Sequence, residues 1–270
     1  MTYSQGGEDV DAAALRRRCA EGYVEAWRQF GRMTRGSIEE SDGATRIATG
    51  MPGPDFNPMF VTEPPRDPDG IIAAARSFFA RQGVRWNMVI IDYGRPDRAP
   101  LEWAAEAAGM ERVSVNPGMV LAPIPAEGKP TPEGLSIGIV DTPEELEVYM
   151  KTMADGFEMP PEVLAPLNDP SSLNAFDVTR YLGRSEGLPV VTGLRATANR
   201  VAVLFNIVTL PVWRRRGFGE AITMVAARDG MAEGCVASFL QSTIMGFSLY
   251  LHAGYRHITD FHVWAQKSPQ

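Results

Sequence analysis

The residues with the clearest potential for chemistry are three consecutive arginines and two glycines, in the stretch Arg214-Arg215-Arg216-Gly217-Phe218-Gly219. The β-branched run over residues 201–210 predicts a buried strand before them, and a helix is predicted to begin near Glu220. A glycine loop at a helix start presents unpaired backbone N–H groups beside the positive end of the helix dipole. Because arginines add charge-assisted hydrogen bonds, the pattern predicts a phosphate site.

Two common phosphate-binding motifs do not fit this loop. A P-loop ends in Gly-Lys-Ser/Thr, whereas this loop continues as Gly219-Glu220-Ala221. A dinucleotide fingerprint needs a third glycine where Ile222 stands, and a carboxylate after the next strand. Three arginines at a helix start are also typical of a solvated surface, and the triplet alone leaves that alternative open.

The second half of the chain resembles the GCN5-related N-acetyltransferase (GNAT) family over about residues 135–268. The signature of that family, Arg/Gln-x-x-Gly-x-Gly/Ala between a strand and a helix, matches residues 214–219. Further along, the family has a tyrosine four residues before Gly-Phe, and here Tyr250 precedes Gly254-Tyr255. The early part, a strand followed by a helix capped at Thr142, has the expected order.

The resemblance implies acetyl-CoA as co-substrate and attack of an amine on its thioester. It also implies that the strand splays open near its end, so that backbone groups there bind the acetyl and pantetheine parts: Val208, Thr209 and Leu210. The pyrophosphate is then expected on the loop and first helical turn, with Arg215 left to solvent: Arg214, Arg216, Gly217, Phe218, Gly219, Glu220 and Ala221.

By the same resemblance, Tyr250 would protonate the departing thiolate. The alternative is a core-facing aromatic residue, since Phe247, Tyr250 and Leu251 share helical spacing. The general base is not identified, because the strand VAVLFNIVT holds no carboxylate or histidine. A water is one alternative, and the acids of the loop after the first helix are another: Asp155, Glu158 and Glu162.

The remaining metal-binding or nucleophilic residue types give no site. His257 and His262 point to opposite faces if residues 257–265 form a strand, so no metal site is predicted. Cys19 and Cys235 lie far apart and form no metal or redox motif, as expected of reduced thiols in a cytoplasmic protein.

Composition is that of a soluble globular protein: 270 residues, 44% hydrophobic and 22% charged. The net charge of −7 argues against a nucleic-acid partner and mildly favours a cationic or amine substrate. Apolar runs fall short of the roughly 20 residues that span a bilayer, and the acidic N-terminus does not fit a signal peptide. We therefore expect no membrane association and a cytoplasmic location; a homodimer is compatible with the sequence.

Residues 122–134 contain four prolines and predict a linker between two halves. The predicted organisation is a disordered N-terminus (1–11), a degenerate GNAT-like domain (12–121), the linker, and an active domain (135–268). The fold class is α/β, each half being a mixed, mostly antiparallel twisted sheet flanked by helices. In the first half, residues 22–33 predict an amphipathic helix on which Tyr23, Trp27 and Phe30 cluster. We expect these side chains to pack in the core; the alternative is that they line a substrate cleft between the halves.

Two sequence echoes predict that the halves arose by duplication. Gly83 aligns with Gly230 at an offset of 147, since each follows a predicted helix and precedes a strand. Residues 109–110 align with 254–255 at an offset of 145. The alternative is that the first half is an unrelated α/β domain.

The offsets map Arg214 to Asp67 and Gly217 to Gly70, and they place Ala105 at the position of Tyr250. Because acids repel a pyrophosphate, the first half is predicted to bind no CoA and to shape the acceptor pocket. We expect acetyl-CoA-dependent N-acetylation of a small-molecule amine. The alternatives are a protein or peptide N-acetyltransferase and a non-catalytic acyl-CoA-binding regulatory protein.

Overall fold

The computed structural model describes residues 6–92, 94–173 and 175–267, and the side chains from residue 12 on. In the first half, the helices and strands are α1 (Gly6–Met33), β1 (Ser37–Ser41), β2 (Ala44–Ala48), β3 (Pro58–Val61), α2 (Pro68–Gln82), β4 (Asn87–Ile91), α3 (Ala99–Ala107) and β5 (Met110–Leu121). In the second half they are β6 (Leu135–Ile139), α4 (Pro143–Phe157), β7 (Val178–Ser185), β8 (Leu188–Ala198), β9 (Val201–Thr209), α5 (Phe218–Ala232), β10 (Ala237–Gln241), α6 (Phe247–His252) and β11 (Arg256–Gln266).

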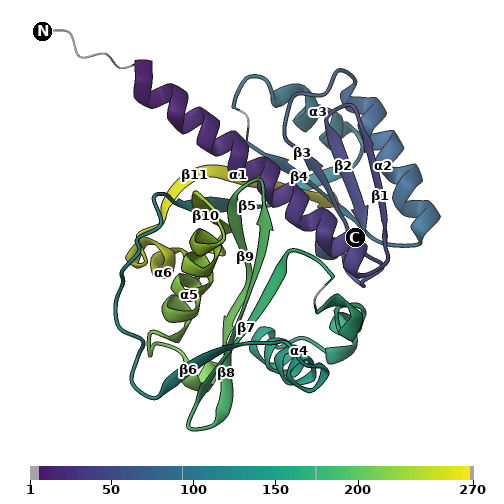
Figure 1. Ribbon diagram of the computed structural model, residues 1–270. Helices are drawn as coiled ribbons and strands as arrows, with labels where there is room; N and C mark the ends of the chain where they lie inside the picture. Colours follow the sequence, from purple (N-terminus) through teal and green to yellow (C-terminus); the bar gives the residue numbers. More distant parts are fainter. Residues whose placement is uncertain (1–5, 93, 174, 268–270) are drawn as a thin grey trace, which may run out of the picture.

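All the strands join in one mixed sheet, in the order β1-β2-β3-β4-β11-β5-β10-β9-β8-β7-β6 (Figure 1). If β1 to β5 are taken as the counterparts of β7 to β11, the strand order read from β1 inward is the same as the order read from β7 inward. β6, at the edge beyond β7, has no counterpart in this comparison. The parallel pairs also match, since β3 pairs with β4 and β9 with β10 in parallel. This arrangement supports the predicted duplication and confirms the α/β class with helices flanking a mixed sheet.

The halves exchange their last strands. β11, from the end of the chain, pairs with β4 of the first half, while β5 of the first half pairs with β10 of the second. β5 and β11 also pair with each other. The predicted boundary at residues 122–134 therefore separates the halves in sequence, but each half depends on the other to complete its part of the sheet.

Helix ends correct one of the predicted offsets. Asp67 caps α2 and Gly217 caps α5, an offset of 150, which β4 and β10 share. Gly230 lies inside α5, where a Cβ would come within 2.6 Å of the Ala202 Cβ, so it is a packing glycine. The turn glycine that corresponds to Gly83 is Gly234, and the 147 alignment is wrong.

The second echo is confirmed. Gly109 and Gly254 both have positive φ, 73° and 91°, and each lies one residue beyond the C-cap position that follows α3 or α6 in the same way. Only glycine adopts this left-handed conformation without strain, so the helix ends in the same way in each half.

α1 crosses the sheet over strands of both halves (Figure 1). Its aromatic residues pack in the core as predicted: the ring of Tyr23 lies 4.8 Å from that of Phe261 and 5.3 Å from that of Phe205. The helix begins at Gly6, so it includes part of the N-terminal segment (1–11) that was expected to be disordered. Residues 1–5 lie outside the described residues. No helix in the described part of the chain is long and apolar enough to cross a membrane.

Candidate active site

β9 and β10 diverge toward their carboxyl ends. They pair only from Val201 to Val203 on β9 and from Ala237 to Phe239 on β10, although β9 continues to Thr209. A bulge bends β9 beyond this point: Asn206 has a φ of 55°, and the Thr192 hydroxyl donates to its carbonyl at 2.9 Å. Asparagine tolerates the left-handed conformation that the bulge needs. The predicted splay is therefore present, and it leaves a gap between the two strands.

In the first half, the matching strands close instead. β3 pairs with β4 along its whole length, from Pro58 with Asn87 to Val61 with Ile90. The gap thus distinguishes the second half from the first.

The loop after β9 leads into an open helix N-terminus. Arg215 and Gly217 have φ angles of 62° and 80°, so the backbone passes twice through the left-handed region before α5 begins. Among the described side chains, none caps α5 at Gly217. By contrast, the N-cap Asp67 of α2 accepts from the N–H of Gly70 at 2.9 Å. The first N–H groups of α5 therefore have no side-chain cap among the described residues, whereas a carboxylate of the chain itself caps the corresponding helix of the first half.

The arginines of the loop have different surroundings. Arg214 donates from Nε to the carbonyl of Thr209 (3.1 Å) and from Nη2 to that of Gly156 (3.3 Å), so it ties the loop to β9 and α4. Arg216 places its guanidinium 4.6 Å from the ring centroid of Trp213, a cation–π contact. Both arginines are exposed, as is Arg215.

The three residues predicted for the acetyl and pantetheine parts face different directions. The N–H of Leu210 donates to the carbonyl of Val190 at 2.9 Å, toward β8. Because amide groups alternate along a strand, Val208 points its N–H to β8 as well, and Thr209 points its N–H into the gap. The side chain of Val208 packs against Gly156 of α4. Thr209 is thus the residue of the three whose N–H suits a ligand in the gap.

A cavity of about 240 Å³ adjoins the α5 N-terminus. Gly217, Glu220 and Ala221 line it, and the proline-rich linker forms its other wall, running as a teal coil past α5 and α6 in Figure 1. Lys129 of the linker pairs with Glu220 at 2.6 Å. Sequence reasoning missed this linker wall, because a linker was expected only to join the halves.

Phe218 and Gly219 are buried under the loop and serve packing. A Cβ on Gly219 would lie 3.0 Å from Cδ1 of Leu249, so this glycine allows α5 and α6 to approach. At these two positions the motif residues pack in the core beside the loop and do not face the loop surface.

Tyr250 lies on α6 and is 8% exposed. Its ring makes an edge contact with Tyr255 at 5.9 Å, and burial raises the pKa of its phenol to about 12. Tyr250 therefore stays protonated at neutral pH. It also packs in the core cluster of α5 and α6, so the alternative of a core aromatic describes its surroundings as well.

The three loop acids considered as bases are all exposed. Asp155 pairs with Lys151 at 2.7 Å, and Glu162 lines a separate cavity beside α4. Glu158 ends α4 with a φ of 54°, two residues after the glycine that contacts Val208 and Arg214. The structure brings none of them to the gap through a described contact, and their role remains a prediction. Burial raises the pKa of the Cys235 thiol, which disfavours it as a nucleophile.

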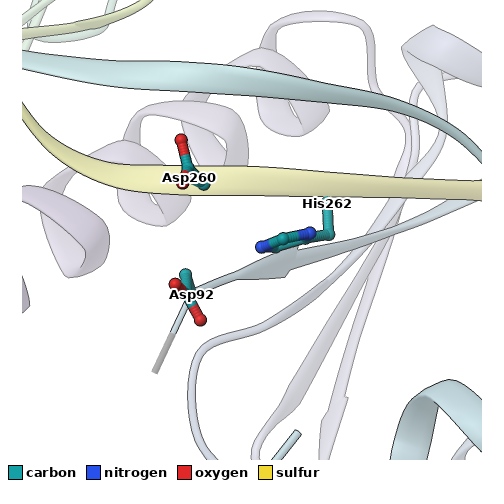
Figure 2. A group of neighbouring side chains, drawn as sticks. All are labelled: Asp92, Asp260 and His262. Carbon is teal, nitrogen blue, oxygen red and sulfur yellow. The ribbon is translucent and has the colours of Figure 1, made fainter. Parts of the chain in front are cut away.

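Sequence reasoning also missed a cluster at the end of β4. Asp92, Asp260 and His262 place ligand atoms within 4.8 Å of one another (Figure 2). Asp92 accepts from the N–H of Gly94 at 2.9 Å and from Arg98. Despite the opposing effect of burial, these partners hold its pKa below the usual value.

The charges around this cluster favour a structural role. His257 contacts Asp260 at 2.8 Å, so both carboxylates already have partners. Burial, and next the Arg98 guanidinium, lower the pKa of His262, which is 5% exposed. A fixed guanidinium bonded to Asp92 would repel a metal cation.

Comparison with solved structures identifies the fold. A GCN5-related N-acetyltransferase from Kribbella flavida superposes with a TM-score of 0.71 at 19% identity, over 94% of this chain and 96% of that one. A functionally unknown conserved protein from Staphylococcus epidermidis matches with a TM-score of 0.63 at 15% identity, over 86% and 94% of the two chains. A tandem GNAT protein from the clavulanic acid biosynthesis pathway matches with a TM-score of 0.56 at 12% identity, over 84% and 80%.

No family model and no curated protein matches the sequence. At these identities the structural likeness shows the fold alone. The chain therefore has the GCN5-related N-acetyltransferase fold over nearly its whole length, in agreement with the predicted tandem architecture.

Proposed function

We propose that the protein transfers an acetyl group from acetyl-CoA to the amine of a small molecule. The observation that carries the proposal is the combination of the β9–β10 gap with the open N-terminus of α5, which occurs in the second half and is closed in the first. A gap between parallel strands beside an uncapped helix N-terminus suits an elongated ligand with a phosphate group at one end.

Different residues of the site would bind different parts of acetyl-CoA. The N–H groups at the start of α5 and the guanidinium of Arg216 would hold the pyrophosphate, while Arg214 keeps the loop against β9. The N–H of Thr209 would donate to the acyl carbonyl and stabilise the negative charge that develops on its oxygen. Held in this way, the thioester meets the amine as a positioned reactant.

In the chemical step, the neutral amine forms a C–N bond with the acyl carbon and the C–S bond breaks. The amine proton leaves to water or to a loop carboxylate, and the sulfur departs as a thiolate. A phenol with a pKa of about 12 is a weak acid toward a thiolate whose conjugate thiol has a pKa of about 8.5. Tyr250 would therefore mainly donate a hydrogen bond to the departing sulfur, whose proton finally comes from solvent.

The test is Tyr250→Phe, with acetyl-CoA binding measured by calorimetry and turnover measured over a panel of amines. We expect one acetyl-CoA site per chain, an unchanged dissociation constant and a loss of kcat of about tenfold or more. Two sites per chain would contradict the closed first half. An unchanged kcat would remove Tyr250 from the mechanism.

A non-catalytic acyl-CoA-binding protein is the second candidate, because β9 holds no carboxylate that could act as a base. This candidate predicts acetyl-CoA binding at one site without turnover of any amine in the panel.

A further inference from the structure

Another cavity, of about 380 Å³, lies on the α1-covered face of the sheet, and residues of both halves form its walls. α1, β3, β4, β5, β10 and β11 all contribute to it. The residues that matter for its chemistry are Trp27, Asp55, Phe60, Asn87, Asn116 and Gln241.

This cavity adjoins the β9–β10 gap. β4 and β10 run antiparallel, because each of the three pairings between them, β4 with β11, β11 with β5 and β5 with β10, is antiparallel. The amino end of β4 and the carboxyl end of β10 therefore lie at the same edge of the sheet. Gln241 ends β10 and also lines the cavity. The ring of Tyr23, another lining residue, lies 5.3 Å from the ring of Phe205, which belongs to the part of β9 that pairs with β8 but not with β10.

The cavity and the predicted CoA site approach the gap from opposite faces of the sheet. Val203 belongs to the core cluster under α1, and the next residue, Leu204, belongs to the cluster under α5 and α6. Two co-substrates bound on these two faces would meet at the gap without competing for space.

Asp55 and Asn87 give one end of the cavity a defined chemistry. Asn87 is 4% exposed, and its Nδ2 donates to the Asp55 carboxylate at 3.0 Å. This contact leaves Oδ1 of Asn87 as a buried acceptor without a partner among the described residues. An unpaired buried acceptor beside a carboxylate matches a ligand with several N–H donors and a positive charge, which is an ammonium group.

The rest of the wall agrees with a cationic ligand. None of the lining residues is lysine, arginine or histidine, and the ring of Phe60 offers an apolar surface to a hydrocarbon stem. The indole of Trp27 lines the cavity too, and its Nε1–H is a buried donor without a partner among the described residues. At the other end, Tyr23 donates to Oε1 of Gln241 at 2.6 Å, which fixes the orientation of this amide. β4 and β10 are three strand spacings apart, about 14 Å, so a ligand that reaches both ends is elongated.

Resting on the proposed acetyl transfer, we infer that this cavity is the acceptor site and that it takes an elongated diamine. Asp55 and Asn87 hold one amine as an ammonium, and the second amine extends past Gln241 to the gap. The first half of the chain thus supplies the recognition of the acceptor, while the second half supplies the acetyl donor.

The experiment measures binding of 1,8-diaminooctane and of 1-aminooctane by calorimetry at neutral pH, in the absence of acetyl-CoA. We expect the diamine to bind about tenfold more tightly than the monoamine. Asp55→Asn should remove most of that difference, and the exposed Glu106→Gln on α3 is the matched loss of one charge and should keep it. Asn87→Leu, checked for folding by circular dichroism, should act like Asp55→Asn.

Acetyl-CoA binding by the same proteins separates this inference from the proposed function. Acetyl-CoA binding together with equal affinities for diamine and monoamine, or with no effect of Asp55→Asn, overturns the acceptor assignment and leaves the transferase function standing. Diamine binding that depends on Asp55, without acetyl-CoA binding, supports the diamine site and overturns the transferase function. When both bind, the product should be the singly acetylated diamine.

Discussion

At the scale of single residues, the structure gives different tasks to side chains that the motif presents as equal. Arg214 and Arg216 were both predicted to face the cofactor. However, two N–H groups of Arg214 donate hydrogen bonds to the carbonyls of Thr209 and Gly156. The guanidinium carbon of Arg216 lies over Trp213, 4.6 Å from the ring centroid, and an arginine over an aromatic ring can still donate from the N–H groups at its rim. We therefore expect Arg216 to carry most of the pyrophosphate contact.

Replacing Arg216 with alanine should weaken acetyl-CoA binding about tenfold. A charge-assisted hydrogen bond contributes about 1.5–3 kcal/mol, and the exposure of Arg216 reduces this toward the lower value. Calorimetric titration measures the change, and thermal unfolding should show an unaltered midpoint. Arg215→Ala is the matched control, since it removes the same charge one residue away. Equal losses in the two variants would mean that only the net charge of the loop matters.

At the scale of elements, the packing of α5 on β9 sets the width of the gap. Gly230 permits this packing, because a Cβ there would lie 2.6 Å from the Cβ of Ala202 and 3.3 Å from Cδ of Arg195. Both β9 and α5 carry parts of the candidate site, so a shift of one against the other changes the site at a distance.

Gly230→Ala should lower the free energy of unfolding by about 1 kcal/mol. Overpacking lowers it by about 1–3 kcal/mol, and the better helix propensity of alanine offsets about 1 kcal/mol of this. Because α5 must move away from β9, acetyl-CoA binding should weaken too. Urea unfolding and calorimetry measure the two effects. Gly138→Ala on β6, where a Cβ meets no atom within 4 Å, is the control. A stabilised Gly230→Ala protein would show that the helix accommodates the methyl group.

The same elements show what sequence reasoning could and could not reach. Signals within one or two elements were predictable, namely the capped start of α4 at Thr142 and the glycine loop before α5. The splay of β9 was expected only from the family resemblance. Gly230 was misaligned because a glycine that packs and a glycine that turns look alike in sequence. The exchange of β5 and β11 was not predictable, since each follows a similar helix and either could pair with β4 or β10.

The candidate acceptor cavity lay beyond sequence reasoning for a related reason. Asp55 and Asn87 belong to no motif. They line the same cavity as Gln241 only because the sheet places β4 and β10 three strands apart, with β11 and β5 between them. A polar residue at the start of a strand is commonly solvent-exposed, so Asn87 gave no signal until its burial and its unpaired oxygen were seen.

At the scale of the whole molecule, buried phenols link the stability of the protein to alkaline pH. In folded proteins, burial raises the pKa of a phenol, because the charged form is poorly solvated. This holds for five tyrosines spread over both faces of the sheet, and the pKa of two of them rises to about 12, Tyr149 and Tyr250. The other three shift in the same direction for the same reason: Tyr23, Tyr181 and Tyr255.

The sign of the effect follows from proton binding. Unfolded tyrosines release their protons near pH 10, whereas the folded protein keeps them to about pH 12 at Tyr149 and Tyr250. Between these values the unfolded state binds fewer protons, so stability is complete below about pH 10 and falls as the pH rises. By about pH 11, each tyrosine should lower the free energy of unfolding by about 1 kcal/mol. The five together approach the total free energy of unfolding of about 5–15 kcal/mol that is typical of proteins.

Urea midpoints at about pH 8 and pH 11, with tyrosinate absorbance recorded in parallel, measure this coupling. We expect tyrosinate to appear only as the protein unfolds, and its appearance in the folded protein would show that these phenols reach water.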